Sequence, residues 1–157
     1  MLTQTRLFGL PRGELTSDDY YTPSWVFDAL GLSFDMDVCA PFGGPPHVPA
    51  DRWFTIDDDG LAQHWEGRVW MNPPFSKTEP WADKFIAHRH GIALVPTSNG
   101  RWYTRLWAAA DAFTIGPEQF EFINGSGHGI PRRICFAAFG DECVEALRNI
   151  GPVRVLG

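Results

Sequence analysis

The sequence of 157 residues predicts one α/β domain built on a mixed, mostly parallel sheet that ends in an antiparallel hairpin. Two observations lead to this prediction. Short β-favouring runs alternate with helix-favouring runs, the order that produces parallel strands joined by crossover helices. The last two β-favouring runs are separated instead by a Gly-rich loop at residues 124–131, which favours an antiparallel pair. The length fits one domain, and an apolar fraction of 44% can supply its core.

The chain begins with a segment that we expect to lie outside the core. Residues 1–17 have no regular apolar spacing and contain Pro11 and Gly13, so they predict a flexible N-terminal arm, with the folded domain at residues 18–157. The apolar spacing of residues 24–30 then predicts a short helix that ends at Gly31. Thr22 and Pro23 suit the cap and first position of that helix.

The next elements form the first half of the sheet. Residues 32–37 alternate apolar and polar like a strand, and residues 41–52 are too rich in Gly and Pro for a long helix, so we expect a shortened crossover. Residues 68–71 favour a strand, residues 78–89 a helix capped by Thr78, and residues 91–96 a buried strand. This strand-helix-strand unit predicts parallel pairing.

The remaining elements complete the predicted fold. Residues 101–110 and 141–149 favour helices, while residues 112–123 and 132–139 favour the two strands of an antiparallel hairpin. Ligands of open α/β sheets bind at the carboxyl ends of the strands. Asp37 and Asn72 both follow predicted strands, so we expect these distant residues to converge.

Charge is distributed unevenly along the chain. The net charge of -6 argues against binding nucleic acid by bulk electrostatics. However, residues 1–66 hold eleven acids and three bases, whereas residues 67–157 hold eight acids and ten bases. Nucleic acid would therefore bind to the second half of the chain. A role in keeping the protein soluble explains the arginines of that half equally well.

Several classes of protein are disfavoured by the sequence. It has neither an apolar run long enough to span a membrane nor an export signal at its start, which predicts a protein that stays in the cytoplasm. Cys39, Cys135 and Cys143 lack metal-type spacing and suit free thiols. His88 and His90 lack further ligands at a suitable spacing, so we expect a helix end there and no metal site.

The tetrapeptide Asn72-Pro73-Pro74-Phe75, called here the Asn-Pro-Pro-Phe loop, carries the strongest chemical signal. Two prolines fix the backbone and remove two donors, which leaves acceptors at fixed positions. An aromatic amine is a poor nucleophile because its lone pair is delocalised, and two acceptors aimed at its hydrogens would draw it toward tetrahedral geometry. The Asn72 side-chain oxygen and the Pro73 carbonyl can be these acceptors, and the Phe75 face can stack on a base.

This loop resembles the Asn/Asp-Pro-Pro-Tyr/Phe motif of amino-methyltransferases that modify adenine N6 or cytosine N4. The flanking stretches resemble, in the same order, the small phage-type DNA N6-adenine methyltransferase family (Dam-like) over about residues 18–140: Tyr20-Tyr21-Thr22-Pro23, residues 34–40, Trp53-Phe54-Thr55, residues 58–61 and residues 70–76. The resemblance implies a Rossmann-like class I methyltransferase fold, S-adenosylmethionine as methyl donor and DNA as substrate, in a phage- or prophage-encoded protein of a bacterial cell. A Pro-Pro turn after an edge strand is the structural alternative for the loop alone.

The resemblance also indicates where the donor binds. The segment from Asp37 to Pro41 resembles the acidic first-motif loop around the methionine part of the donor, although it lacks the Gly-x-Gly form and a plain strand-to-loop turn explains it equally well. A solvated turn is the alternative for Asp57-Asp58-Asp59, whose acids, with Asp51, would otherwise contact the adenosine. The residues expected to bind the donor are Tyr21, Thr22, Pro23, Asp37, Cys39, Ala40, Asp51, Asp58 and Asp59.

DNA is expected to approach through the second half of the chain. A base in a duplex is unreachable, so the target would be unpaired or flipped, with Phe75 replacing its lost stacking. The residues expected to contact DNA are Ser76, Lys77, Arg101, Trp102, Arg105, His128, Arg132 and Arg133. An amphipathic helix and a passive hairpin turn explain the same residues. No segment suits a separate recognition domain, which leaves short loops or a homodimer partner to provide specificity.

Three alternatives to adenine methylation remain open at this level. The same loop would serve an N4-cytosine DNA methyltransferase, and it also occurs in enzymes that methylate protein glutamine, because an amide nitrogen poses the same nucleophile problem. A catalytically inactive relic that binds DNA or donor is the third alternative.

Overall fold

The computed structural model describes residues 21–123 and 129–155, so the predicted N-terminal arm lies outside the described residues. The described strands form a seven-stranded sheet in the order β2-β1-β3-β4-β8-β5-β9. The first four strands in this order run parallel, whereas β8 is antiparallel to both β4 and β5, and β9 is antiparallel to β5. Their bounds are β1 (Phe34–Asp37), β2 (Ala50–Trp53), β3 (Val69–Met71), β4 (Gly91–Pro96), β5 (Ala112–Ile115), β8 (Ile134–Phe139) and β9 (Val153–Val155).

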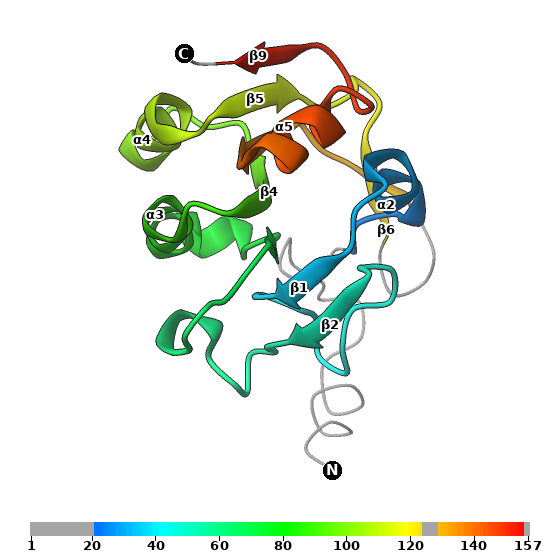
Figure 1. Cartoon of the computed structure of the whole chain (residues 1–157). Coiled ribbons are helices and arrows are strands. Elements are labelled where there is room, and N and C mark those ends of the chain that lie inside the picture. Colours follow the sequence, from blue (N-terminus) through cyan, green and yellow to red (C-terminus); the bar gives the residue numbers. More distant parts are fainter. Residues whose placement is uncertain (1–20, 124–128, 156–157) are drawn as a thin grey trace.

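Helices cover both faces of this sheet and give three layers (Figure 1). Helices α2 (Ser24–Leu30) and α5 (Asp141–Leu147) pack on one face, whose core includes Phe27, Trp70 and Phe136. Helices α3 (Thr78–His88) and α4 (Arg101–Ala109) pack on the other face, whose core includes Phe85, Met71 and Leu106. The central strands β3, β4 and β8 are thus buried on both faces, as expected for strands covered by helices on each side.

The structure confirms the predicted order of most elements. Strands β3 and β4 are parallel and are joined through α3, and α2 ends at Gly31, which takes the left-handed conformation with φ 66°. Both predicted helix caps differ, because the N-caps are Pro23 and Lys77 and neither makes a side-chain cap hydrogen bond. The hydroxyls of Thr22 and Thr78 are instead committed to the Asn-Pro-Pro-Phe loop.

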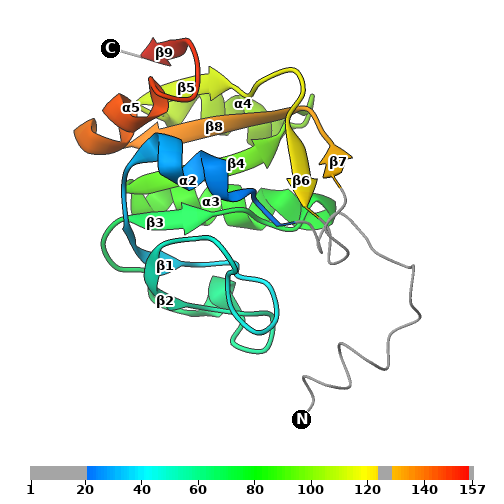
Figure 2. The same cartoon turned by 90° about the vertical axis from the view of Figure 1, so that its right-hand side faces the viewer.

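The predicted hairpin is formed in part. Strands β5 and β8 pair antiparallel, but β6 (Glu121–Ile123) leaves the sheet and pairs with β7 (Gly129–Pro131) as a separate two-stranded ribbon. The ribbon stands at one end of the sheet, beside the start of α2 (Figure 2). The predicted shortened crossover is confirmed, since turns connect β1 to β2. Strands β2 and β9 were not predicted, because both are short and largely exposed.

The strand order contains one reversal that matters for function. From β1 the chain moves to β2 on one side, then returns to place β3 on the other side of β1. Such a topological switch point separates the loops at the carboxyl ends of the two central strands and is where open α/β sheets bind ligands. In this protein the switch point lies between the segments that follow Asp37 and Met71.

Candidate functional site

The switch point brings the two predicted active segments together. Asp37 is in register with Trp70 on the neighbouring strand, and the Val38 N–H donates to the Trp70 carbonyl at 3.1 Å. Because paired strands lie about 4.8 Å apart, the loops after β1 and β3 leave the sheet side by side. The predicted convergence of Asp37 and Asn72 at one edge of the sheet is therefore confirmed.

The side chain of Asn72 is held by a residue from a third segment. Its Nδ2 donates to the Thr22 Oγ1 at 3.3 Å, although the two residues are fifty positions apart. Thr22 is buried, with 5% of its surface exposed, and Asn72 is half-buried. With the amide nitrogen engaged by Thr22, the Oδ1 atom is the end of the amide that remains to accept a hydrogen bond from a ligand.

The rest of the Asn-Pro-Pro-Phe loop is fixed to α3. The Thr78 Oγ1 lies 3.2 Å from the Pro74 carbonyl and 3.4 Å from the Phe75 carbonyl, to which it can donate. The Lys77 N–H also donates to the Pro74 carbonyl, at 3.1 Å. Pro73 is buried. The loop is therefore anchored at both ends, by Thr22 and by the first residue of α3.

Phe75 connects the loop to the β6–β7 ribbon. Its half-buried ring packs edge-on against Phe122 at a centroid distance of 5.7 Å, and the Arg132 guanidinium lies 5.9 Å from its centroid. A base that stacks on Phe75 must therefore use the remaining ring surface or displace Arg132. The sequence did not reveal the Phe122 contact, because strand alternation gives no information about partners outside the strand.

Asp37 is a buried carboxylate at the end of β1. Only 2% of its surface is exposed, and burial raises its pKa to about 7, while a hydrogen bond from the Cys39 N–H to Oδ1 at 3.2 Å acts in the opposite direction. Among the described residues, this N–H is the carboxylate's hydrogen-bond donor. A buried carboxylate with so little compensation suits a cationic ligand group, which would favour its ionised form.

The loop after β2 packs against the loop after β1. A Cβ on Gly60 would lie 2.1 Å from the Val38 carbonyl oxygen, so only glycine allows this approach. The Ala40 N–H also donates to the Phe54 carbonyl at 2.8 Å. These contacts bring the acidic segment of residues 57–59 to the same edge of the sheet as Asp37.

The acids of this region differ in their surroundings. Asp58 Oδ2 accepts from the Thr55 N–H at 2.9 Å and lies 3.2 Å from the Thr55 Oγ1, so this carboxylate closes its own turn. Asp59 is exposed and takes the left-handed conformation with φ 55°. Asp51 is exposed on β2. Asp58 Oδ2 is thus engaged within its own turn, whereas Asp59 and Asp51 are exposed.

The residues expected to contact DNA divide into two groups. The backbone of the Arg132-Arg133 segment is fixed by two hydrogen bonds, from the Thr97 N–H to the Arg133 carbonyl at 3.2 Å and from the Arg132 N–H to the Phe120 carbonyl at 3.1 Å. The contact of this segment with the site is the Arg132 guanidinium at the Phe75 ring. Ser76, Lys77 and Arg101 are exposed, and Trp102 is half-buried at the start of α4. His128 lies outside the described residues.

Arg105 lies in a different environment. Its guanidinium pairs with Glu79 and Asp83 of α3, each at 2.9 Å, and hydrogen bonds to these acids raise its pKa. This arginine links α4 to α3. Contact with a phosphate would have to compete with two carboxylates.

The segment around Tyr21 and strand β6 frame the loop, and the pairing between them was not predicted from the sequence. Tyr21 pairs with Ile123 through an isolated β-bridge, with its N–H donating at 2.8 Å and its carbonyl accepting at 2.9 Å. Strand β6 therefore contacts the site twice, through this bridge and through the Phe122 ring. The signal that could have indicated a separate ribbon is the turn-forming Gly116-Pro117 within residues 112–123.

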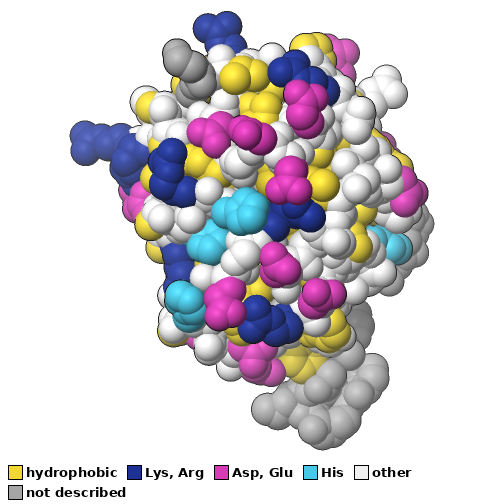
Figure 3. All heavy atoms as spheres, in the orientation of Figure 1, with side chains coloured by type: hydrophobic (Ala, Val, Ile, Leu, Met, Phe, Trp, Pro, Cys, Tyr) yellow, Lys and Arg dark blue, Asp and Glu magenta, His cyan; other side chains and the backbone are white. Residues whose placement is uncertain are grey.

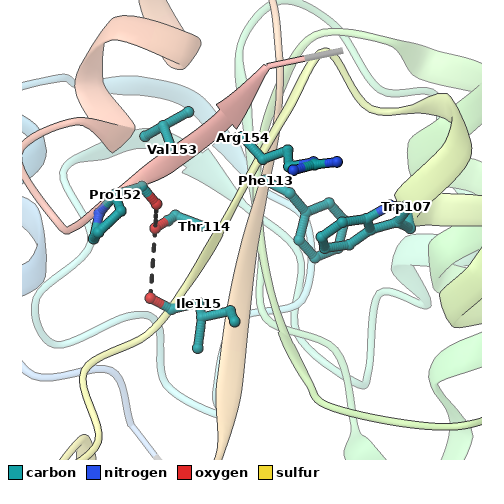
Figure 4. A pocket seen from close by; sticks show the side chains of 7 residues that line it. All are labelled: Trp107, Phe113, Thr114, Ile115, Pro152, Val153 and Arg154. Atoms are coloured by element: carbon teal, nitrogen blue, oxygen red, sulfur yellow. Dashed lines mark hydrogen bonds between the residues drawn. The ribbon is translucent and has the colours of Figure 1, made fainter.

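An apolar pocket lies at the β5–β9 edge of the sheet, several strands away from this site. It is lined by Trp107, Phe113, Thr114, Ile115, Pro152, Val153 and Arg154 (Figure 4). Thr114 Oγ1 is hydrogen-bonded to the Pro152 and Ile115 carbonyls beside it. Strands β4 and β8 separate this edge from β3.

The described part of the chain has neither a candidate metal-ion cluster nor a candidate membrane-spanning helix. Within it, no group of three or more His, Cys, Asp or Glu side chains is arranged to hold a metal ion. Its helices are all too short or too polar to cross a membrane. On the face shown in Figure 3, acidic and basic side chains are interspersed.

The three-layer fold and its switch point, with an anchored Asn-Pro-Pro-Phe loop beside a buried carboxylate, define a Rossmann-like methyltransferase. The chain belongs to the DNA N-6-adenine-methyltransferase (Dam) family, whose profile matches residues 13–132. It is therefore an enzyme that methylates the N6 amino group of adenine in DNA, as the sequence predicted.

Two curated proteins show significant similarity. The chain is 28% identical over 119 residues to a DNA N-6-adenine-methyltransferase of Haemophilus phage HP1, covering 68% of this chain and 67% of that protein. It is also 28% identical over 79 residues to an alpha-L-rhamnosidase of Streptomyces avermitilis, covering 48% of this chain but only 8% of that protein. No solved structure shows significant similarity to the chain.

Proposed function

We propose that the enzyme uses S-adenosylmethionine as its methyl donor and that Asn72 and Pro73 hold the N6 amino group of adenine during transfer. The observation that carries this proposal is the hydrogen bond from Asn72 Nδ2 to Thr22, which leaves Oδ1 as the acceptor at the switch point. The Oδ1 atom accepts from one N6 hydrogen, and the Pro73 carbonyl accepts from the other. These two contacts localise the nitrogen lone pair for attack.

The donor supplies an electrophilic methyl group bound to a positively charged sulfur. The protein's contribution is to align the amino nitrogen with that carbon and to exclude water, because such a transfer needs positioning more than acid or base strength. The N6 proton that is lost departs along the hydrogen bond to Asn72 Oδ1 or Pro73 and passes to solvent. Phe75 supports the base through its ring.

The donor would lie between the loops that follow β1 and β2. Asp37 fits its ammonium group, because this buried carboxylate lacks a cationic partner among the described residues. The backbones of Cys39 and Ala40 border the methionine part, with Tyr21, Thr22 and Pro23 on the opposite side. Asp59 and Asp51 fit the adenosine better than Asp58, whose carboxylate closes a turn.

DNA would reach the site from the side of the β6–β7 ribbon. Arg132 reaches the Phe75 ring, and Arg133 is joined through its backbone to the segment after β4. The same edge is bordered by Ser76, Lys77, Arg101 and Trp102. His128 is included among the proposed DNA contacts on the basis of the sequence. A homodimer, which would supply further DNA contacts, stays part of the proposal.

The proposal is tested by incubating unmethylated genomic DNA with enzyme and donor, then digesting the DNA to nucleosides for mass spectrometry. We expect N6-methyladenine with the wild-type enzyme and none with Asn72→Ala, whose donor affinity should change less than about twofold. Asn149→Ala, on the exposed turn after α5, is the matched control and should retain wild-type activity. Full activity of Asn72→Ala would overturn the mechanism, and N4-methylcytosine as the product would overturn the substrate.

A further inference from the structure

The Asn72 amide must present a particular end to its substrate. An amino group has hydrogens to donate, so it requires the Oδ1 end, and the Nδ2 end must then find its own acceptor. Since Asn72 is half-buried, an amide nitrogen without an acceptor would be destabilising. The Thr22 Oγ1 is the acceptor present, at 3.3 Å.

Thr22 is itself firmly placed. Its side chain is buried, and the preceding residue, Tyr21, is fixed by a pair of backbone hydrogen bonds to Ile123 of β6, at 2.8 and 2.9 Å. The following residue, Pro23, has φ fixed near -68° at the start of α2. The hydroxyl therefore has little freedom to follow a moving Asn72, and the amide is oriented by a rigid neighbour.

Strand β6 reinforces this arrangement from a second direction. Phe122 contacts the Phe75 ring, while the adjacent Ile123 carries the bridge to Tyr21. One short strand thus holds both the residue that orients Asn72 and the aromatic end of the same loop. A side chain that served only to fill the core would not need a hydroxyl at this position.

We propose that Thr22 is a positioning residue for methyl transfer, because its Oγ1 engages Asn72 Nδ2 and keeps Oδ1 directed at the substrate amine. The proposal rests on the function proposed above, in which Oδ1 is an acceptor for that amine. Thr22 also stands among the residues expected to border the donor, and this role makes a different prediction. A donor-binding role changes donor affinity, whereas a positioning role changes the rate with donor bound.

The experiment compares Thr22→Val, which keeps the shape and removes the hydroxyl, with Thr22→Ser, which keeps the hydroxyl. For each variant, the single-turnover rate of N6 methylation is measured at saturating donor and DNA, and donor affinity is measured by calorimetry. We expect Thr22→Val to lower the rate by about 10- to 100-fold with donor affinity within about twofold. Thr22→Ser should stay within about threefold of the wild-type rate.

A matched control is available on strand β5, toward the opposite edge of the sheet. Thr114 is buried to a similar degree, with 2% exposed, and its hydroxyl also makes a hydrogen bond, to the Pro152 carbonyl. Thr114→Val should lower the melting temperature without changing the single-turnover rate. Comparing the two valine variants separates loss of stability from loss of positioning.

Two outcomes would overturn this inference while leaving the proposed function intact. One is a wild-type rate for Thr22→Val when Asn72→Ala is inactive, and the other is a weakened donor affinity with an unchanged rate at saturation. If Asn72→Ala itself retains full activity, the proposed function fails first. A rate loss in Thr22→Val that serine does not share supports the positioning role.

Discussion

At the scale of single residues, the site is defined by polar side chains that are buried with few hydrogen-bond partners. Asp37 is 2% exposed and, in the described part of the protein, receives one backbone hydrogen bond on its carboxylate. The cost of burying its charge raises its pKa to about 7, well above the ordinary value of 3.8. The ionised form of such a carboxylate is stabilised most by an adjacent cation. The ammonium group of the proposed donor would be such a cation.

Donor affinity should therefore depend on pH in a defined direction. Below pH 7 the Asp37 carboxyl is protonated before binding, and a bound ammonium favours the ionised form, so binding releases a proton. We expect the donor dissociation constant to rise by up to about 10-fold per pH unit below pH 7 and to level off within about one pH unit above it. Calorimetry in buffers with different ionisation enthalpies measures both the affinity and the released proton.

The control for this measurement is a pair of variants on one strand. Asp37→Asn removes the titrating group and should weaken donor binding while abolishing the pH dependence. Asp35→Asn changes an exposed acid on the same strand and leaves an acceptor for the Arg68 N–H, so it should behave like wild type. A pH dependence that persists in Asp37→Asn would assign it to another group.

At the scale of elements, the site depends on close contacts between loops. The loops after β1 and β2 touch where Gly60 lies against the Val38 carbonyl, and the ribbon of β6 and β7 touches the Asn-Pro-Pro-Phe loop through Phe122. Neither contact follows from the secondary structure of the segments involved. Each is made by loops or short strands that the sheet order brings to the same edge.

The Gly60→Ala variant tests the first contact. The added Cβ would lie 2.1 Å from the Val38 carbonyl oxygen, so the two loops must separate. We expect a loss of about 1–3 kcal/mol of stability and about 10-fold weaker donor binding, measured by thermal unfolding and calorimetry. Gly151→Ala is the control, because its Cβ would meet the nearest atom at an ordinary 3.4 Å. Equal behaviour of the two variants would show that the loop contact is unimportant.

At the scale of the whole molecule, the distribution of charge determines how a negatively charged enzyme binds negatively charged DNA. The net charge is -6, yet the half of the sequence that begins at residue 67 holds ten bases and eight acids. Several of these bases are used internally, as in the ion pairs of Arg105 with α3. DNA contact therefore depends on few arginines, and the salt dependence of binding should be modest.

Replacing Arg132 with glutamine should show how much Arg132 contributes to DNA binding. We expect weaker DNA binding and a salt slope reduced by about 0.9 if one phosphate contact is lost, with donor affinity unchanged. Fluorescence anisotropy at several salt concentrations measures the slope. Arg148→Gln, directly after α5 where Arg148 pairs with Glu145, should match the wild-type slope. An unchanged slope for Arg132→Gln would place DNA elsewhere.

The sequence alone supported much of the fold because its signals are local. Apolar spacing located α2, α3, α4 and α5 within two residues at each end, and Gly31 terminated α2 as expected. The hairpin was only partly predicted, since β-favouring residues 112–123 belong to two strands that pair with different partners. Pairing is decided by distant chain segments, to which local propensity is insensitive.

The available chemistry can be read from the residues alone: an Asn-Pro-Pro-Phe loop and an acid at the ends of two strands, in an order typical of DNA N6-adenine methyltransferases. Which of these groups are engaged by other residues follows from the three-dimensional fold. It joined Thr22 to Asn72 across fifty residues, committed Asp58 and Arg105 to internal partners, and placed Arg132 at the Phe75 ring. These contacts depend on the order of strands in the sheet, which brings distant segments within hydrogen-bonding range. Strand order cannot be predicted from the local sequence of each strand.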